Sequence, residues 1–244
     1  ALAAGVGDEG RRIVQVWRQG DPMGEAAASG LRAALPEHAA ARLIEHPLAA
    51  GADAEADFWR RLIDSPVTLV LWLDRWPAAL PADLAPRLAA VHLSYRLLGD
   101  ELPEPPPELA EKVRLTWPYA LPAAAAPHSY RVRAWLRSRR VPPGDERLQL
   151  ATWWTAAVVD HALAHMVDRF DRAWLVERVE HEAELVMDPG VYPAPALGPG
   201  QRFASKGTWI VRLEPVAAGG VVPVGERWRV PVAAPAAAAA SSRP

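Results

Sequence analysis

The sequence predicts an α/β fold: a parallel β-sheet flanked by helices, followed by a helical second half and a late β-hairpin. First, short β-branched or apolar runs alternate with helical patterns over residues 11–100. Second, the run VTLVLWL at 67–73 is continuously apolar, as in a strand buried on both faces of a parallel sheet. Third, the proline-rich segment ELPEPPPEL, which begins at Glu101, ends this alternation. Alternation at this pace favours a sheet covered by helices.

The α/β lobe is expected over 11–100, after a flexible N-terminus at 1–10. Its strands are predicted at 12–17, 41–47, 67–73 and 91–98, and its helices at 25–35, 54–63 and 84–90. Each strand is a short run rich in apolar or β-branched residues, and each helix repeats apolar residues at helical spacing. We therefore expect a sheet of about four or five parallel strands.

The second half is predicted to be helical after a proline-rich crossover at 101–128. A helical region at 129–190 contains helix 146–170, with an apolar stripe, and helix 172–187, with Asp171 as its N-cap. A loop and late strands follow at 191–231, where 208–213 and 227–230 suit a hairpin. The alanine-rich end at 232–244 is expected to be disordered.

Composition excludes several classes of function. The chain has 244 residues, no cysteine and a net charge of −2. The lack of cysteine excludes disulfides, thiolate metal sites, iron–sulfur clusters and a cysteine nucleophile. The charge balance gives no general attraction to nucleic acid or anionic membranes, and no apolar run approaches the ~20 residues of a membrane span. The sequence indicates no cofactor, no nucleophile elbow and no enzyme active site.

Several segments in order resemble the type I periplasmic binding proteins, the family that includes the branched-chain amino acid receptors of ABC importers. The matching segments are RIVQVWRQGDPMGEAAASGLRAAL, SPVTLVLWLD, LQLATWWTAAVVDHAL and VYPAPALGPGQRFASKGTWIVRLEP, and together they span about 11–230. The resemblance implies a non-enzymatic module that binds a small polar organic solute, such as an amino acid, an amide or a carboxylate, for an ABC importer or a sensor.

The same resemblance implies partners and a location. The partner would be an ABC permease, and the location the periplasm; the first ten residues show no signal-peptide pattern, so the location rests on the resemblance alone. We also expect the family's first lobe to be absent, in which case another chain would supply it. A scaffold that binds no ligand and keeps an interaction surface is a further hypothesis.

Residues that follow the predicted strands are the candidates for the solute site, because ligands of open α/β sheets bind outside the carboxyl ends of the strands. Arginine can pair with a carboxylate, aspartate with an ammonium group, and an aromatic ring can cover an apolar group. The candidates are Arg18, Asp21, Asp74, Trp76, Ser94, Tyr95 and Arg96. The alternative interpretation is that these are solvated loop residues.

Histidines suggest a different function, metal binding. His161 and His165 lie one helical turn apart, and Glu177 and His181 have the same spacing on the next predicted helix. An antiparallel helix pair would bring these nitrogen and oxygen ligands together. The alternative is that the histidines belong to the apolar stripe and are satisfied by hydrogen bonds. The segment GPGQRFASKG at 198–207 is either an anion-binding loop or a structural turn.

Overall fold

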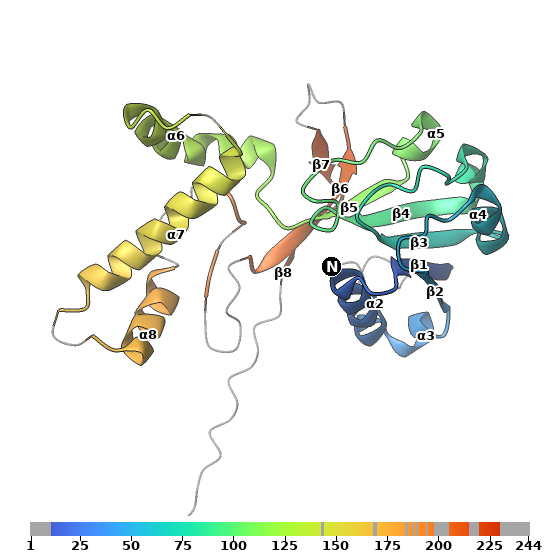
Figure 1. Cartoon of the computed structure of the whole chain (residues 1–244), viewed down its shortest axis with the longest axis horizontal. Helices are drawn as coiled ribbons and strands as arrows, with labels where there is room; N and C mark the ends of the chain where they lie inside the picture. The colour runs from blue at the N-terminus through green and yellow to red at the C-terminus, as the bar shows by residue number, and fades with distance from the viewer. Residues whose placement is uncertain are drawn as a thin grey trace, which may run out of the picture.

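The structure, a computed structural model, describes residues 11–142, 144–167, 170–183, 185–186, 188, 190–193, 195–197, 205–214 and 220–229. It confirms the predicted α/β class, with one mixed sheet and helices packed against it. Figure 1 shows the sheet at one side of the molecule and the long helices of the second half at the other. No helix among the described residues is both long and apolar enough to cross a membrane.

Five parallel strands form the first part of the sheet, in the order β2-β1-β3-β4-β5. They are β1 (Arg12–Arg18), β2 (Leu43–Leu48), β3 (Val67–Trp72), β4 (Leu88–Ser94) and β5 (Val113–Trp117). The late strands then extend the sheet in antiparallel fashion, β6 (Gly207–Leu213) beside β5, and both β7 (Val221–Pro223) and β8 (Trp228–Arg229) beside β6.

Helices connect the parallel strands and then make up the second half. The connecting helices are α2 (Pro22–Ala34), α3 (Glu37–Ala40), α4 (Ala56–Leu62), the 3₁₀ helix η2 (Ala82–Arg87) and α5 (Pro107–Ala110). The later helices are α6 (Pro122–Ser138), α7 (Glu146–Ala164) and α8 (Arg172–Glu182). Asp171 caps α8 as predicted, because its carboxylate accepts a hydrogen bond from the backbone N–H of Trp174 at 2.8 Å.

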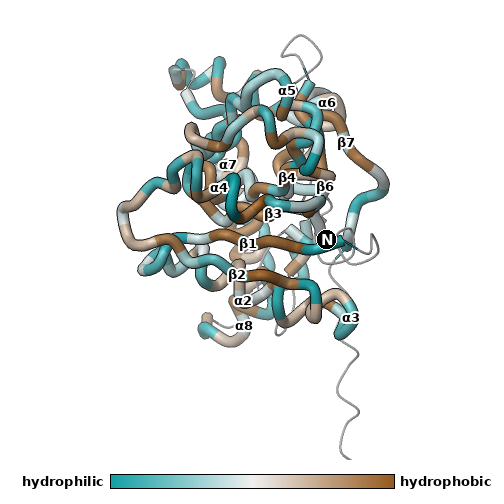
Figure 2. Tube along the Cα trace, turned by 90° about the vertical axis from the view of Figure 1, so that its right-hand side faces the viewer, coloured by the Kyte–Doolittle hydropathy of each residue, from teal (hydrophilic) through white to brown (hydrophobic). Residues whose placement is uncertain are grey.

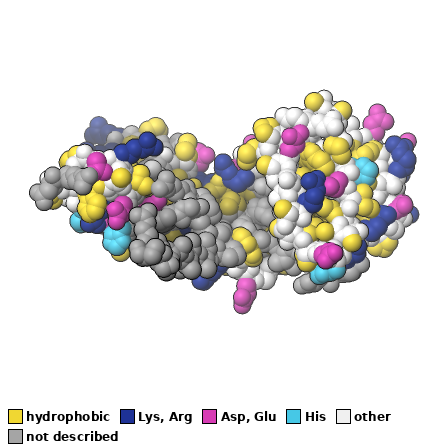
Figure 3. All heavy atoms as spheres, turned by 90° about the horizontal axis from the view of Figure 1, so that it is seen from below, with side chains coloured by type: hydrophobic (Ala, Val, Ile, Leu, Met, Phe, Trp, Pro, Cys, Tyr) yellow, Lys and Arg dark blue, Asp and Glu magenta, His cyan; other side chains and the backbone are white. Residues whose placement is uncertain are grey.

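The sheet buries both faces, which explains the continuous apolar run of β3. Leu69 and Leu71 face a large core that includes Trp59 of α4, whereas Val70 and Trp72 face α2 on the opposite side. Figure 2 shows the hydrophobic segments of the strands, most clearly in β1 and β2. Seen from below, charged side chains of both signs are scattered over the sheet part of the surface (Figure 3), in keeping with the small net charge.

Several element boundaries differ from the sequence prediction. The expected helix at 84–90 is a 3₁₀ helix that ends at Arg87, and Pro86 within it explains its short length. The fourth strand ends at Ser94 because residues 95–100 turn, with Gly99 in the left-handed region at φ 69°. The predicted helices at 146–170 and 172–187 end earlier, at 164 and 182.

The predicted crossover at 101–128 contains regular structure. β5 alternates buried and half-buried residues inside it, and α6 begins at Pro122, where proline is tolerated in the first turn of a helix. The late strands include β7, which the sequence analysis did not predict, and β7 rather than β8 continues the main order of the sheet. The expected flexible segment at 1–10, the tail at 232–244 and residues 198–204 of the possible anion loop lie outside the described residues.

Candidate functional site

The strand order places the candidate site at the carboxyl edge of the parallel strands. In the sheet, β2 lies on one side of β1 and β3 lies on the other side. The chain therefore adds strands in one direction up to β2 and in the opposite direction from β3 onward, and this reversal lies between β1 and β3. Loops that leave neighbouring strands on either side of such a switch point diverge, and ligands bind in the crevice that they leave. The loops that follow β1, β3 and β4 are therefore the candidates for a ligand site.

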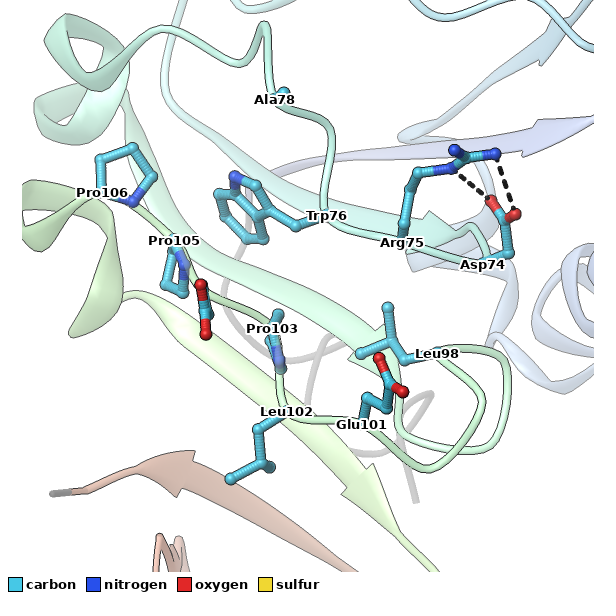
Figure 4. Close-up of a pocket in the computed structure, with 11 residues that line it drawn as sticks. Asp74, Arg75, Trp76, Ala78, Leu98, Glu101, Leu102, Pro103, Pro105 and Pro106 are labelled. Carbon is cyan, nitrogen blue, oxygen red and sulfur yellow. Dashed lines mark hydrogen bonds and ion pairs between the residues drawn. The ribbon is translucent and has the colours of Figure 1, made fainter. Parts of the chain in front are cut away.

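A groove of about 780 Å³ lies at the ends of β3 and β4. One wall is the loop 74–78 that follows β3, and the other is the segment 98–106, which leads from β4 to α5. In Figure 4 the half-buried indole ring of Trp76 projects between these walls toward the prolines of the second one. Trp76, Leu98 and the prolines at 103, 105 and 106 thus give the groove apolar sides.

The polar lining of the groove is mostly acidic. The Asp74 carboxylate lies 3.3 Å from Nη2 of Arg75 and 3.5 Å from Nε of Arg18, so it is already neutralised. Glu101 and Glu104 are exposed, and neither forms an ion pair within the described part of the chain. The groove therefore offers two uncompensated carboxylates beside an aromatic ring, which favours a cationic or hydrogen-bond-donating group over an anion.

Arg18 and Asp21, both predicted ligand residues, hold the neighbouring loops in place. Nη2 of Arg18 lies 2.5 Å from the Asp53 carboxylate, and Nη1 donates to the backbone oxygen of Ala52. The hydrogen bond to Asp53 raises the pKa of Arg18 despite partial burial. Asp21 is the N-cap of α2, with its carboxylate accepting from the N–H of Met23 at 3.1 Å. Neither side chain lines the groove.

A second feature, which we call the aromatic–arginine cluster, lies at the ends of β4 and β5 and consists of Tyr95, Asp100, Trp117, Tyr119 and Arg147. The rings of Tyr95 and Trp117 are 4.2 Å apart between centroids, and Tyr119 packs edge-on against both. The Arg147 guanidinium, which comes from α7, lies 4.4 Å from the centre of the Tyr119 ring and 5.2 Å from that of Tyr95. The cluster thus ties the helical half to the edge of the sheet.

Asp100 is the acidic centre of this cluster. Its carboxylate accepts from Arg96 at 2.5 Å and from the Tyr119 hydroxyl at 3.2 Å, and it lies 3.8 Å from Arg147. Its backbone is in the left-handed region at φ 66°, which aspartate tolerates better than most residues. Burial, together with the charge of Asp100, raises the pKa of Tyr119. Burial lowers the pKa of Arg147, but the contacts with Tyr95 and Asp100 raise it by more, so the net shift of the pKa is upward.

Comparison with known proteins gives a fold but no close relative. No protein-family model matches the sequence, and no curated protein matches it significantly. Among solved structures, a fatty acid ABC transporter substrate-binding protein from Thermomonospora curvata aligns over 90% of this chain with a TM-score of 0.56 and 20% identity. A protein assigned to branched-chain amino acid ABC transport in Rhodospirillum rubrum aligns over 91% with a TM-score of 0.61 and 15% identity.

A periplasmic binding protein type 1 from Bordetella pertussis Tohama I aligns over 91% of this chain, with a TM-score of 0.53 and 14% identity. The chain has the type I periplasmic binding protein fold. The expected resemblance is thereby confirmed at the level of the fold. The alignments cover 57%, 62% and 63% of the three solved chains, so this chain spans less than two thirds of their length.

Within this type I fold, the predicted solute residues separate into three groups. Asp74 and Trp76 lie together in the groove, whereas Arg18 and Asp21 secure adjoining loops. The other predicted residues are on the aromatic–arginine cluster or beside it: Tyr95 is 5% exposed, Arg96 pairs with Asp100, and Ser94 ends β4. Their role in ligand binding remains a prediction.

Sequence reasoning missed the acidic wall of the groove and the centre of the cluster. Glu101 and Glu104 belong to the segment that was interpreted only as a stiff connection. Their position in the connection that follows a strand, interleaved with prolines, is the signal that could have identified them. Asp100 and Arg147 are 47 positions apart in sequence and carry no local signal, yet the structure places them 3.8 Å apart.

The structure gives the predicted histidine pair a different carboxylate neighbour. Among the described residues, His161 and His165 share a cluster with Glu182, and this cluster does not include Glu177 or His181. Glu177 lies in the middle of α8, whereas Glu182, its last residue, faces the last turn of α7, and the neighbouring His181 side chain lies outside the cluster. The hydroxyl of Ser205, in the possible anion loop, lies 2.9 Å from the backbone oxygen of Pro118 and 2.8 Å from that of Gly207 and can donate its one proton to either, which favours a structural turn.

Proposed function

We propose that this chain is a non-enzymatic solute-binding module and that the groove beside Trp76 holds a small polar organic solute. The observation that carries the proposal is the groove itself, which lies at the carboxyl ends of β3 and β4 in a sheet ordered β2-β1-β3-β4-β5. In open parallel sheets that edge is the usual place for a ligand. A volume of about 780 Å³ suits a small organic molecule.

The chemistry of the lining narrows the class of solute. An apolar side group would pack on the Trp76 ring and the adjacent prolines, and an ammonium or amide N–H would face the carboxylates of Glu101 and Glu104. An amino acid or an amide therefore suits the groove better than a simple carboxylate, which these glutamates would repel. Among the described residues of the lining, Arg75 is the one basic side chain, and it is paired with Asp74.

The biological setting follows by analogy with proteins of the same fold. Solved neighbours are described as ABC transporter proteins for fatty acids and for branched-chain amino acids. We propose that the module delivers its solute to an ABC permease or a sensor in the periplasm. The supporting fact is the common fold, together with alignments that cover 57–65% of the solved neighbours.

Calorimetric titration and thermal melting of the purified chain test the proposal. The ligands are branched-chain and polar amino acids, their amides and the corresponding carboxylates. A solute at about 100 times its Kd should add about 2.7 kcal/mol to the free energy of unfolding. Trp76→Ala and the double change Glu101→Gln with Glu104→Gln should each weaken binding by about tenfold or more. Glu37→Gln, an exposed change on α3, is the control.

Two results would contradict the proposal. One is a parent chain that melts cooperatively and shows neither heat of binding nor a stability gain with any of these solutes. The other is a solute that binds the groove variants as tightly as it binds the parent and the Glu37 control.

A further inference from the structure

We propose that His161, His165 and Glu182 form a binding site for a divalent transition-metal ion such as Zn²⁺. One potential ligand atom from each residue lies within 4.8 Å of the other two. Two imidazole nitrogens and one carboxylate oxygen match the donor set of many zinc sites, which leave a fourth position for water or another ligand. This site lies on α7 and α8, away from the groove, and does not depend on the proposed solute function.

Helix packing brings the three residues together. His161 is in the last turn of α7 and His165 is its C-cap, so the two rings lie four residues apart on one side of the helix, with centroids 4.9 Å apart. A small core that contains Trp154, Val158 and Ala183 holds α8 against α7. Figure 1 shows α8 beside the lower part of α7. Glu182, the last residue of α8, is thereby directed at the histidine pair.

Glu182 is an unusual residue for a structural role alone. Its side chain is 3% exposed, and a buried carboxylate is costly unless cations or donors compensate it. Its oxygens lie 2.6 Å from Nδ1 of His161 and 3.8 Å from Nδ1 of His165. Arg178 of α8 lies 3.8 Å from it, and the neighbouring His181 also acts on its charge. The carboxylate is thus fixed, anionic and directed at two imidazoles.

The two histidines can adjust to a metal ion. Their side chains are 51% and 47% exposed, and Figure 3 shows histidine side chains at the surface of the helical part. Tetrahedral ligands with bonds of about 2.0–2.1 Å lie about 3.3 Å apart, so the three ligand atoms, which lie within 4.8 Å of one another, would draw closer around an ion. The metal would take the place of the proton between His161 and Glu182, and in the neutral ring that proton would move to Nε2 of His161, which leaves Nδ1 free to bind the ion.

The carbonyl group of His161 already orients the second ring. Nδ1 of His165 lies 2.8 Å from this oxygen, which only accepts hydrogen bonds, so Nδ1 carries the proton. Nε2 of His165 is then unprotonated in the neutral ring and is the nitrogen available to a metal, so the 3.8 Å between Nδ1 and Glu182 places the ring and not the ligand atom. An imidazole fixed by a hydrogen bond on its other nitrogen is the usual arrangement of a metal-binding histidine.

The experiment uses the full chain after removal of metal with EDTA. Zn²⁺ is titrated by calorimetry, and Co²⁺ by the visible absorption of a tetrahedral complex. We expect one ion per chain at this site, with binding lost in His165→Ala and weakened by about tenfold or more in Glu182→Gln. His181→Ala is the matched control, because it removes a histidine of α8 that lies outside the cluster, and it should bind like the parent.

Glu182 is buried, so its variant could unfold. The test therefore depends on the variant of His165, whose side chain is exposed, and circular dichroism checks that this variant keeps its helices. Zn²⁺ binding that is unchanged in His165→Ala would overturn the proposal. So would a parent chain that binds neither ion, since the cluster would then be only a structural ion pair. The groove variants should bind Zn²⁺ normally, which separates this proposal from the solute function.

Discussion

Because the imidazole of His92 is buried, we predict that the folded protein loses stability in mild acid. His92 lies on β4, beside Val70 of β3 and Arg114 of β5, and is 8% exposed. Burial, with a smaller contribution from the charge of Arg114, lowers the pKa of His92 to about 4. In the unfolded chain the same group titrates near 6.5. The folded protein therefore keeps His92 neutral over a range in which the unfolded chain binds a proton.

The sign and size of the effect follow from this difference. Between about pH 6.5 and pH 4 the unfolded state binds more protons, so the free energy of unfolding falls as the pH falls. A separation from about 6.5 to about 4 corresponds to about 3 kcal/mol, lost progressively across that window. This is a large part of the stability of a typical domain.

Urea denaturation of the parent and of His92→Leu from about pH 7 down to about pH 4.5 tests this reasoning. Leucine removes the titrating group, and Nδ1 of His92 has no hydrogen-bond partner to lose within the described residues. The parent should lose about 2–3 kcal/mol more than the variant over this range. His38→Gln, a change on the short helix α3, should follow the parent. Parallel stability curves for the parent and His92→Leu would refute the argument.

Three further predictions concern the fold and the edge of the sheet. Asp100→Ala should lower the free energy of unfolding by about 1–3 kcal/mol in urea titration, because it leaves Arg96, Arg147 and the Tyr119 hydroxyl without their shared acceptor. A change below about 0.5 kcal/mol would contradict this prediction. Asp171→Ala should cost about 1 kcal/mol by removal of the cap of α8, measured by thermal melting followed by circular dichroism. Trp59→Ala, at a 0% exposed position, should cost about 3–5 kcal/mol in urea denaturation, and a smaller loss would mean that the core collapses into the space.

Local patterns were sufficient to predict the fold class and most of the parallel strands. The run VTLVLWL was the strongest strand signal in the sequence, and β3 is buried at all six of its positions. Asp171 was recognisable as an N-cap because a cap bonds to a backbone group three residues away. Such features depend on neighbours in sequence, which the sequence displays directly.

Boundaries were harder to predict because they depend on packing. β5 was obscured by the prolines around it, although Val113, Leu115 and Trp117 alternate as a half-buried strand should. Only its pairing with β4 on one side and β6 on the other establishes it as part of the sheet. The addition of antiparallel strands to a parallel sheet likewise joins segments about 90 residues apart, and no local pattern encodes that contact.

The sequence by itself determined that the chain is an α/β protein with functional residues expected after the strands, because periodicity and strand ends are local properties. Only the tertiary structure decided which of those residues meet. It placed Trp76 opposite a wall of prolines and glutamates, surrounded Asp100 with Arg96 and Arg147, and replaced the predicted Glu177 and His181 by Glu182 beside the histidine pair. These juxtapositions join distant segments, and they depend on the rotation and packing of whole elements, which residue spacing along the chain does not specify.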